Sequence, residues 1–301
     1  MKKKKSLIII AGGVCILVAA FFLKKDIKTD DIIWTSYVHD KNGNINGGRV
    51  CTYRDGKREC IDNIALSNVS MKEKNLLVGM QNLYPDAKGF KGIITYNISS
   101  KEVIEILACD RIYDYLDDRK IDFRGNIQVT KDGNLYFFTC GKKMLLYDVE
   151  KDNLETLFET SCNQYVLNEG ETCLYFSENG ILFQYNLTEH TKDKIIDQVN
   201  NFTISRDETL IIYEDRKKRE LFLMEMETGK KEKLLEVNYV DNLIYISEDN
   251  KCLLYTDYKE SMIPTNRRVE IYVFELETGK QKKIYRGDYG DNIRSVLWEK
   301  L

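Results

Sequence analysis

The sequence predicts an all-β fold, a six-bladed β-propeller, and three observations lead to it. The first is a segment that recurs at residues 129, 167, 204 and 246, which are 38, 37 and 42 residues apart. This spacing is close to the length of one propeller blade. The second is a further hairpin after each copy. The third is a single strand at the carboxyl end, which completes an incomplete unit at the amino end.

Each recurring segment consists of a short strand, a polar turn and an apolar strand, as in residues 129–138. The apolar strands, at residues 135–138, 174–176, 210–213 and 253–255, are apolar on both faces. A strand that is buried on both faces lies between two layers, and stacked blades provide these layers. We expect no amphipathic helix in the body of the chain.

A second hairpin completes each unit. Residues 221–235 and 271–285 align without a gap, and residues 93–98, 144–149 and 182–187 are weaker copies of its first strand. Four strands per unit, named A to D from the inside out, are typical of a propeller blade. The units lie near residues 66–107, 127–158, 164–197, 202–236 and 243–286.

The two ends of the body together supply the sixth blade. Residues 32–38 and the hairpin around residues 51–60 provide only three strands, while residues 292–298 form one strand without a partner. We therefore predict that the carboxyl-terminal strand pairs with the amino-terminal blade as its innermost strand. This pairing closes the ring and removes a free sheet edge.

The repeat has a pattern that can be named. A Ser-x-Asp turn before an apolar strand, followed by a hairpin that ends in Thr-Gly-Lys, resembles the TolB-like, or WD-like, six-bladed propeller repeat over most of residues 66–286. This resemblance implies the fold and not a function, because such a fold hosts many functions. Lys72 stands where later copies have Asp132, Asp207 and Asp249, which we interpret as turn-forming residues.

The head of the chain predicts a membrane anchor. Residues 1–5 form a basic cytoplasmic tail, residues 6–23 an uncharged signal-anchor of 18 residues, and residues 24–31 a linker to the propeller domain at 32–301. As a helix, the uncharged run is about 27 Å long, close to one hydrocarbon core. The lysines before it favour a single-pass protein in the cell membrane with an extracytoplasmic body.

Two alternatives to a retained anchor stay open. Val18-Ala19-Ala20 supplies the small residues of a signal-peptide cleavage site, although the apolar run continues beyond it. Cys15 is compatible with a lipoprotein, although Val14 before it is a poor match to such sites. High lysine, isoleucine and asparagine contents are typical of a low-GC bacterium.

Charge argues against one class of partner. The chain has a net charge of −3, with 45 basic and 48 acidic residues. Residues 1–28 contain seven lysines and one aspartate, so the body has 38 basic and 47 acidic residues, a net charge of −9. An acidic body of this kind argues against nonspecific binding to nucleic acid.

The eight cysteines predict one possible disulfide. Cys51 and Cys60 flank an Asp-Gly hairpin turn, and counting outward from the turn places them opposite each other, at a distance that a disulfide accepts. Two free thiols are the alternative. Cys173 and Cys252 occupy a position where other copies have leucine, so we expect them in the core.

Long connections gather on one face of the predicted ring. The A–B and C–D turns are short and share what we call the short-turn face. The connections at residues 80–91, 108–126 and 257–268 fall on the opposite, long-loop face, where binding is expected. Candidate ligand-binding residues there are Tyr84, Asp86, Phe90, Asp114, Tyr115, Asp118, Phe123, Tyr258 and Arg267. The alternative is that these loops pack on themselves.

Motifs for catalysis, metals or cofactors do not occur in the sequence. His39 and His190 are the only histidines, and neither accompanies a nucleophile motif. We therefore predict a non-catalytic, extracytoplasmic, membrane-anchored propeller that binds a protein or peptide through the long-loop face, with no metal and no cofactor. One alternative is a carbohydrate-active hydrolase or lyase that uses loop carboxylates. Another is a structural subunit of a cell-envelope complex.

Overall fold

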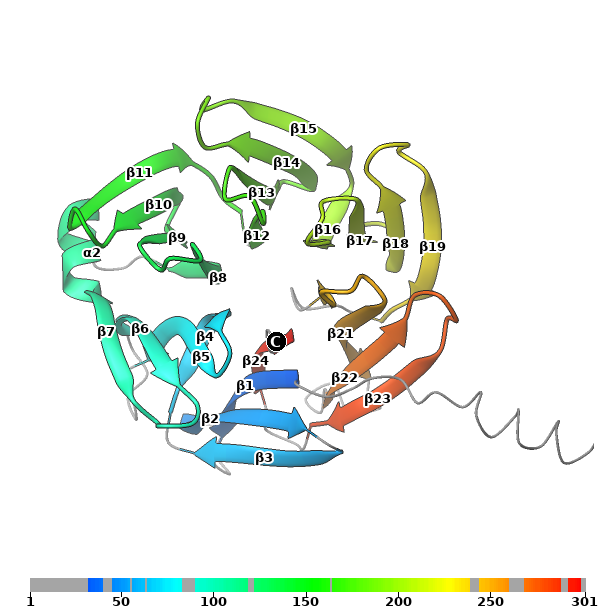
Figure 1. The fold of residues 1–301 in the computed structure, drawn as a ribbon, viewed down its shortest axis with the longest axis horizontal. Coiled ribbons are helices and arrows are strands. Elements are labelled where there is room, and N and C mark those ends of the chain that lie inside the picture. The colour runs from blue at the N-terminus through cyan, green and yellow to red at the C-terminus, as the bar shows by residue number, and fades with distance from the viewer. Residues whose placement is uncertain are drawn as a thin grey trace, which may run out of the picture.

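In the computed structural model, the chain forms a ring of six four-stranded antiparallel sheets (Figure 1). The structure describes residues 32–39, 45–54, 56–62, 64–82, 90–118, 122–162, 164–238, 244–259, 268–287 and 292–298. The prediction of an all-β, six-bladed propeller is confirmed. The predicted signal-anchor at residues 6–23 lies outside the described residues, and within them no helix is long and apolar enough to cross a membrane.

The first three blades, given from the inner strand to the outer one, combine both ends of the chain with its first half. Blade one contains β24 (Asn292–Trp298), β1 (Ile32–His39), β2 (Ile45–Arg54) and β3 (Lys57–Asp62). Blade two contains β4 (Leu66–Glu73), β5 (Leu76–Asn82), β6 (Phe90–Asn97) and β7 (Val103–Ala108). Blade three contains β8 (Phe123–Val129), β9 (Leu135–Cys140), β10 (Lys143–Asp148) and β11 (Asn153–Glu159).

The other three blades follow the sequence in order, within a few residues of the predicted units. Blade four contains β12 (Gln164–Leu167), β13 (Cys173–Glu178), β14 (Ile181–Asn186) and β15 (Lys192–Asp197). Blade five contains β16 (Val199–Ile204), β17 (Leu210–Asp215), β18 (Glu220–Glu225) and β19 (Lys231–Glu236). Blade six contains β20 (Ile244–Ile246), β21 (Cys252–Lys259), β22 (Arg268–Glu275) and β23 (Gln281–Arg286).

The carboxyl-terminal strand closes the ring as predicted. β24 pairs antiparallel with the inner side of β1, and Ile32 lies opposite Trp298 while Trp34 lies opposite Val296. A bulge interrupts the pairing between Thr35 and Ser36. Because β2 occupies the other side of β1, pairing with β24 leaves β1 no free edge.

The core consists of apolar layers between neighbouring blades, which explains the B strands that are apolar on both faces. In β13, Cys173 and Tyr175 pack in the layer shared with blade five. Leu174 and Phe176, on the other face of the same strand, pack in the layer shared with blade three. The prediction that Cys173 and Cys252 are core residues is confirmed, since both are buried.

One helix interrupts the strands, and the prediction of a helix-free body is wrong at this point. Helix α2 spans Cys109–Leu116, inside the segment that the sequence suggested as a loop. Cys109, Ile112 and Leu116 recur at helical spacing and pack between blades two and three, where Figure 1 shows the helix beside β7 and β11. With eight residues, the helix is too short for a clear periodic signal.

The predicted disulfide is present. Cys51 and Cys60 face each other in the β2–β3 ladder, with Thr52 opposite Glu59 in the same register. Their α-carbons lie 4.0 Å apart and their sulfurs are bonded. The turn between them includes Gly56, whose φ of 73° suits glycine without strain.

Removing β24 should prevent a stable closed ring. A chain that ends after Gly287 loses the strand that covers β1, and buried Val296 and Leu297 are lost with it. We expect a large drop in the thermal unfolding midpoint, or aggregation through the open edge, followed by circular dichroism and sedimentation. A chain that ends after Trp298 keeps β24 whole and serves as the control. Equal midpoints for the two truncated chains would contradict the closing role of β24.

Removing the disulfide should lower the free energy of unfolding by about 2–3 kcal/mol, because the bridge closes a short loop in the unfolded chain. The measurement is urea unfolding of the wild type and of Cys60→Ser, each with and without a reductant. The reductant should shift the wild type toward the variant and leave the variant unchanged. A wild type whose stability does not change after its bridge is reduced would be inconsistent with this role.

Candidate functional site

The A–B turns that border the central channel share one construction. In three of them a hydroxyl donates to the aspartate two residues later, from Thr130 to Asp132, Ser205 to Asp207 and Ser247 to Asp249. The same hydroxyls accept the backbone N–H of the residue that starts the next strand. The interpretation of these aspartates as turn formers is confirmed.

The residue between the hydroxyl and the aspartate projects from each turn, and its charge alternates from blade to blade. In blades three to six this position holds Lys131, Glu169, Arg206 and Glu248; blade four replaces the hydroxyl residue by Asn168, whose amide oxygen accepts two backbone N–H groups instead. Neighbouring turns therefore present opposite charges to each other.

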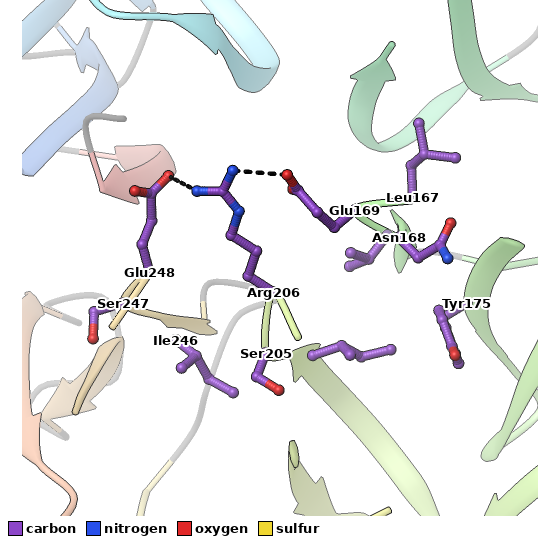
Figure 2. Close-up of a pocket in the computed structure, with 11 residues that line it drawn as sticks. Leu167, Asn168, Glu169, Tyr175, Ser205, Arg206, Ile246, Ser247 and Glu248 are labelled. Atoms are coloured by element: carbon purple, nitrogen blue, oxygen red, sulfur yellow. Dashed lines mark hydrogen bonds and ion pairs between the residues drawn. The ribbon is translucent and has the colours of Figure 1, made fainter. Parts of the chain in front are cut away.

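These side chains form a chain of ion pairs across four blades. Lys131 Nζ lies 2.6 Å from Glu169 Oε1. Arg206 then bridges two acids, with Nη2 2.7 Å from Glu169 Oε1 and Nη1 3.4 Å from Glu248 Oε1. Figure 2 shows the guanidinium reaching between the two carboxylates from neighbouring turns.

A pocket lies under this chain of ion pairs. Its volume is about 160 Å³, and blades four, five and six contribute its lining. Apolar side chains of the inner strands, among them Leu167, Ile204 and Ile246, line it together with Tyr175. The Tyr175 hydroxyl donates to Glu208 Oε2 at 2.8 Å. Asn168, Ser205 and Ser247 add polar groups to the lining. The pocket is therefore a small recess with mixed apolar and polar walls and a charged rim.

Neighbouring charges shift the pKa values of two rim side chains, Glu169 and Arg206. Partial burial tends to raise the pKa of Glu169, but hydrogen bonds from Lys131 and Arg206 outweigh burial, so that its pKa lies below the usual value. The hydrogen bond to Glu169 raises the pKa of Arg206 further. All four side chains are partly exposed, from 35% for Glu169 to 61% for Lys131. Exposed pairs are worth about 0–1 kcal/mol each, so a charged group of a partner can replace them.

The channel beside the pocket is bridged. Asn126 of β8 donates a hydrogen bond to the Tyr245 hydroxyl of β20, which joins blades three and six on opposite sides of the ring. Trp298 of β24 donates to the Tyr245 carbonyl at 3.4 Å. These contacts hold the inner strands of three blades in fixed positions.

The structure distributes the residues predicted for the long-loop face over several environments. Tyr84, Asp86 and Arg267 lie outside the described residues. Phe90 begins β6 and Tyr258 belongs to β21, so their backbones lie in strands and not in loops. For these five residues, the structure therefore does not test whether their side chains form a common site.

The remaining four candidates lie around α2 and β8. Asp114 and Tyr115 belong to α2, and the Tyr115 hydroxyl lies 3.2 Å from Thr156 Oγ1 on the outer strand of blade three. The helix therefore carries them along the outer rim of the ring. Asp118 is exposed just beyond the helix, whereas Phe123 is buried against Phe138, with a ring-centroid distance of 6.3 Å. Phe123 is thus a core residue.

Sequence reasoning missed the charged rim because it treated the A–B turns as short connections without function. A signal was present. At the variable position of the turn, lysine, glutamate, arginine and glutamate follow one another in consecutive repeats. Only the ring geometry, however, places those four positions side by side around one opening.

No family model and no curated protein matches the sequence. Solved structures match its fold. A crystal structure of TolB from Acinetobacter baumannii has a TM-score of 0.70 and 10% identity, with 90% of this chain and 67% of that chain covered. A chain from a crystal structure of the nidogen/laminin complex has a TM-score of 0.60 and 11% identity, with 89% of this chain and 100% of that chain covered. The resemblance to the TolB-like repeat is confirmed at the level of the fold.

The turn that carries Arg206 should lose stability in acid. Hydrogen bonds from Ser205, then from Thr209, lower the pKa of Asp207 to about 2, below the value near 3.9 of an unfolded chain. Because the folded-state pKa is the lower one, the contribution of the carboxylate is fully present above about pH 4–5 and is lost as the pH falls toward about 2.

Urea unfolding of the wild type and of Asp207→Asn over this pH range tests the prediction. The stability difference should be constant at neutral pH and should shrink below about pH 4. Asp193→Asn, on the outer strand of blade four, controls for the loss of one negative charge. A difference between the wild type and Asp207→Asn that is independent of pH would contradict the assignment.

Proposed function

We propose that this protein is a non-catalytic, membrane-anchored propeller that holds a protein or peptide partner outside the cytoplasm. The observation that carries the proposal is the recess at the mouth of the channel. Its volume of about 160 Å³ is below the roughly 300–1,000 Å³ of typical small-molecule sites. A recess of this size suits one or two side chains of a larger partner.

The rim provides the means of recognition. Glu169, Arg206 and Glu248 form an acid–base–acid row with its side chains partly exposed. A basic side chain of a partner can pair with the two acids, and an acidic one can take over the guanidinium. The charged rim can orient a partner, and the apolar side chains of the recess provide contact area. A peptide or protein contact requires both.

The same geometry speaks against a carboxylate hydrolase at this site. Such an enzyme needs one carboxyl group with a raised pKa as the general acid. Glu169 and Glu248 both pair with Arg206, and the pKa of Glu169 is lowered. Glu169, held in its ionised form, donates no proton to a leaving group.

Buried carboxylates elsewhere in the described residues also have structural partners. Glu214 accepts hydrogen bonds from Asn200 and Asn201 at 2.8 and 2.6 Å. Glu270 lies 3.0 Å from Lys283 Nζ and accepts a hydrogen bond from the Tyr272 hydroxyl. Both acids connect neighbouring strands. Burial raises the pKa of Glu214, but two asparagine side chains already bond to its carboxylate, which supports a structural role.

Location outside the cytoplasm rests on two arguments. The uncharged run at residues 6–23 follows four lysines, an arrangement that favours an extracytoplasmic body. The bond between Cys51 and Cys60 is of a kind that persists in oxidising compartments. We also retain, within this proposal, the long-loop face as a second contact surface for the partner.

A pull-down from native membranes tests the proposal and the face that is used. The bait is the body of the protein, compared with Arg206→Ala at the rim and with Lys233→Ala as the matched control, since Lys233 also pairs with two acids but lies on the outer strand of the same blade. A third variant replaces residues 83–89, 119–121 and 260–267 by short Gly/Ser turns. We expect a specific protein that the wild type and Lys233→Ala retain and that Arg206→Ala binds at least about tenfold more weakly.

Other outcomes are equally informative. If only the loop variant loses the partner, binding takes place on the long-loop face and the rim assignment fails. If no protein depends on any of these residues, the proposed binding function is contradicted, and a glycan and peptide screen becomes the next experiment.

A further inference from the structure

The outer edge of blade two differs from the other outer edges of the ring. Each blade ends in a D strand with a neighbour on one side only in the sheet order. Such an edge is a template for pairing with another strand, and charged side chains, lysine above all, hinder this pairing. The first residues of the D strands show which edges are protected.

Five of the six D strands are protected or covered. Four begin with mainly charged residues, namely Lys57-Arg58-Glu59 of β3, Lys192-Asp193-Lys194 of β15, Lys231-Glu232-Lys233 of β19 and Gln281-Lys282-Lys283 of β23. The fifth, β11, lies beside α2. Arg111 of this helix forms an ion pair with Asp152, and its Tyr115 contacts Thr156.

At its first residues β7 has neither kind of protection, because α2 follows its last residue, Ala108. It begins with Val103 and Ile104, whose side chains are 42% and 50% exposed. Among the described residues, the other exposed large hydrophobic side chains are Tyr115 on α2 and Val149 in the turn between β10 and β11. These four residues belong to blade two, to blade three and to the helix between them.

The ladder of blade two shows which backbone groups face outward. Asn97 N donates to Glu102 O at 2.9 Å, and Thr95 lies opposite Ile104 in the register of β6 and β7. Hydrogen-bonded and non-hydrogen-bonded pairs alternate along an antiparallel ladder. The peptide groups of Val103 and Glu105 therefore point to the open edge, where another strand would meet them.

Charge defines the chemistry of that strand. Lys101 and Glu102 are exposed just before β7 and Glu105 is exposed on it, while Asp110 and Asp117 are exposed on or beside α2. Arg111, the basic residue within α2, is engaged by Asp152. The rim thus combines apolar side chains with a surplus of acidic ones, which complements a segment that is both apolar and basic.

We propose that β7 accepts an extended segment of a partner protein, which adds a fifth strand to blade two by β-augmentation. The segment alternates aliphatic residues with lysine or arginine, so that basic side chains face Glu105 and aliphatic ones lie against Ile104. This surface is separate from the channel mouth, and the inference does not depend on the function proposed above.

The probe is a short labelled peptide that alternates lysine with valine, and binding to the full chain is followed by fluorescence anisotropy. Two matched peptides separate the contribution of backbone hydrogen bonds from that of the basic side chains. One carries N-methyl groups that remove alternate backbone donors, and the other has glutamate in place of lysine. We expect each to bind at least about tenfold more weakly than the first. Hydrogen exchange should show new protection at the amides of Val103 and Glu105.

The matched protein variant is Val103→Lys with Ile104→Glu, which copies Lys231 and Glu232 of β19. Because both side chains are exposed, its thermal unfolding should match that of the wild type, while binding of the lysine–valine peptide should be lost. Val149→Lys removes an exposed valine of the same rim that is not on the edge, and should retain binding.

Three results would overturn the proposal. The first is a lysine–valine peptide that binds no better than its glutamate counterpart. The second is a double variant that binds the peptide as the wild type does. The third is a concentration-dependent dimer in sedimentation that the double variant abolishes, since a second copy of this chain would then occupy the edge.

Discussion

Closure of the ring by β24 is the constraint on which the rest of the structure depends. The strand and its neighbour β1 contribute to two apolar layers at once. Ile33 and Leu297 pack in the layer with blade two, while Trp34 and Val296 pack in the layer with blade six. Blade one is therefore the joint between the two ends of the chain. The positions of all blades relative to one another depend on it, because each blade is otherwise fixed mainly by its neighbours, with one bond across the ring from Asn126 to Tyr245.

The inner strands of neighbouring blades belong to separate sheets, so backbone pairing does not fix their spacing. Side-chain amides connect them instead. Gln164 of β12 donates to the Phe202 carbonyl at 2.5 Å and accepts from the Phe202 N–H at 2.8 Å. Gln128 of β8 donates to the Ser70 hydroxyl at 3.2 Å and accepts from the Leu167 N–H at 3.4 Å. These bonds hold the inner strands at a fixed spacing, so the turns above them present their charges in a fixed order.

Much of this fold could be predicted from the sequence, because most blades correspond to one continuous repeat of the sequence. The Ser-x-Asp turns and the apolar B strands gave the number of blades, and the Asp-Gly turn gave the pairing of Cys51 with Cys60. Helix α2 was missed, since its apolar residues fill one gap between blades and are not part of the repeat. Phe123 was misplaced because one aromatic residue beside a loop gives no sign of burial. The rim was missed because its contacts join residues of different repeats.

The A–B turn separates the demands of folding from those of recognition within three consecutive residues. Its hydroxyl and aspartate bond to each other and to the backbone, so they determine the shape of the turn. The side chain of the residue between them forms ion pairs instead and varies in charge, as Lys131 and Arg206 illustrate, with Glu169 at the equivalent position after Asn168. A substitution there changes what the channel mouth offers to a partner at little cost to the blade. A propeller of this kind can therefore change partners without changing its fold, which is why the fold by itself identifies no partner.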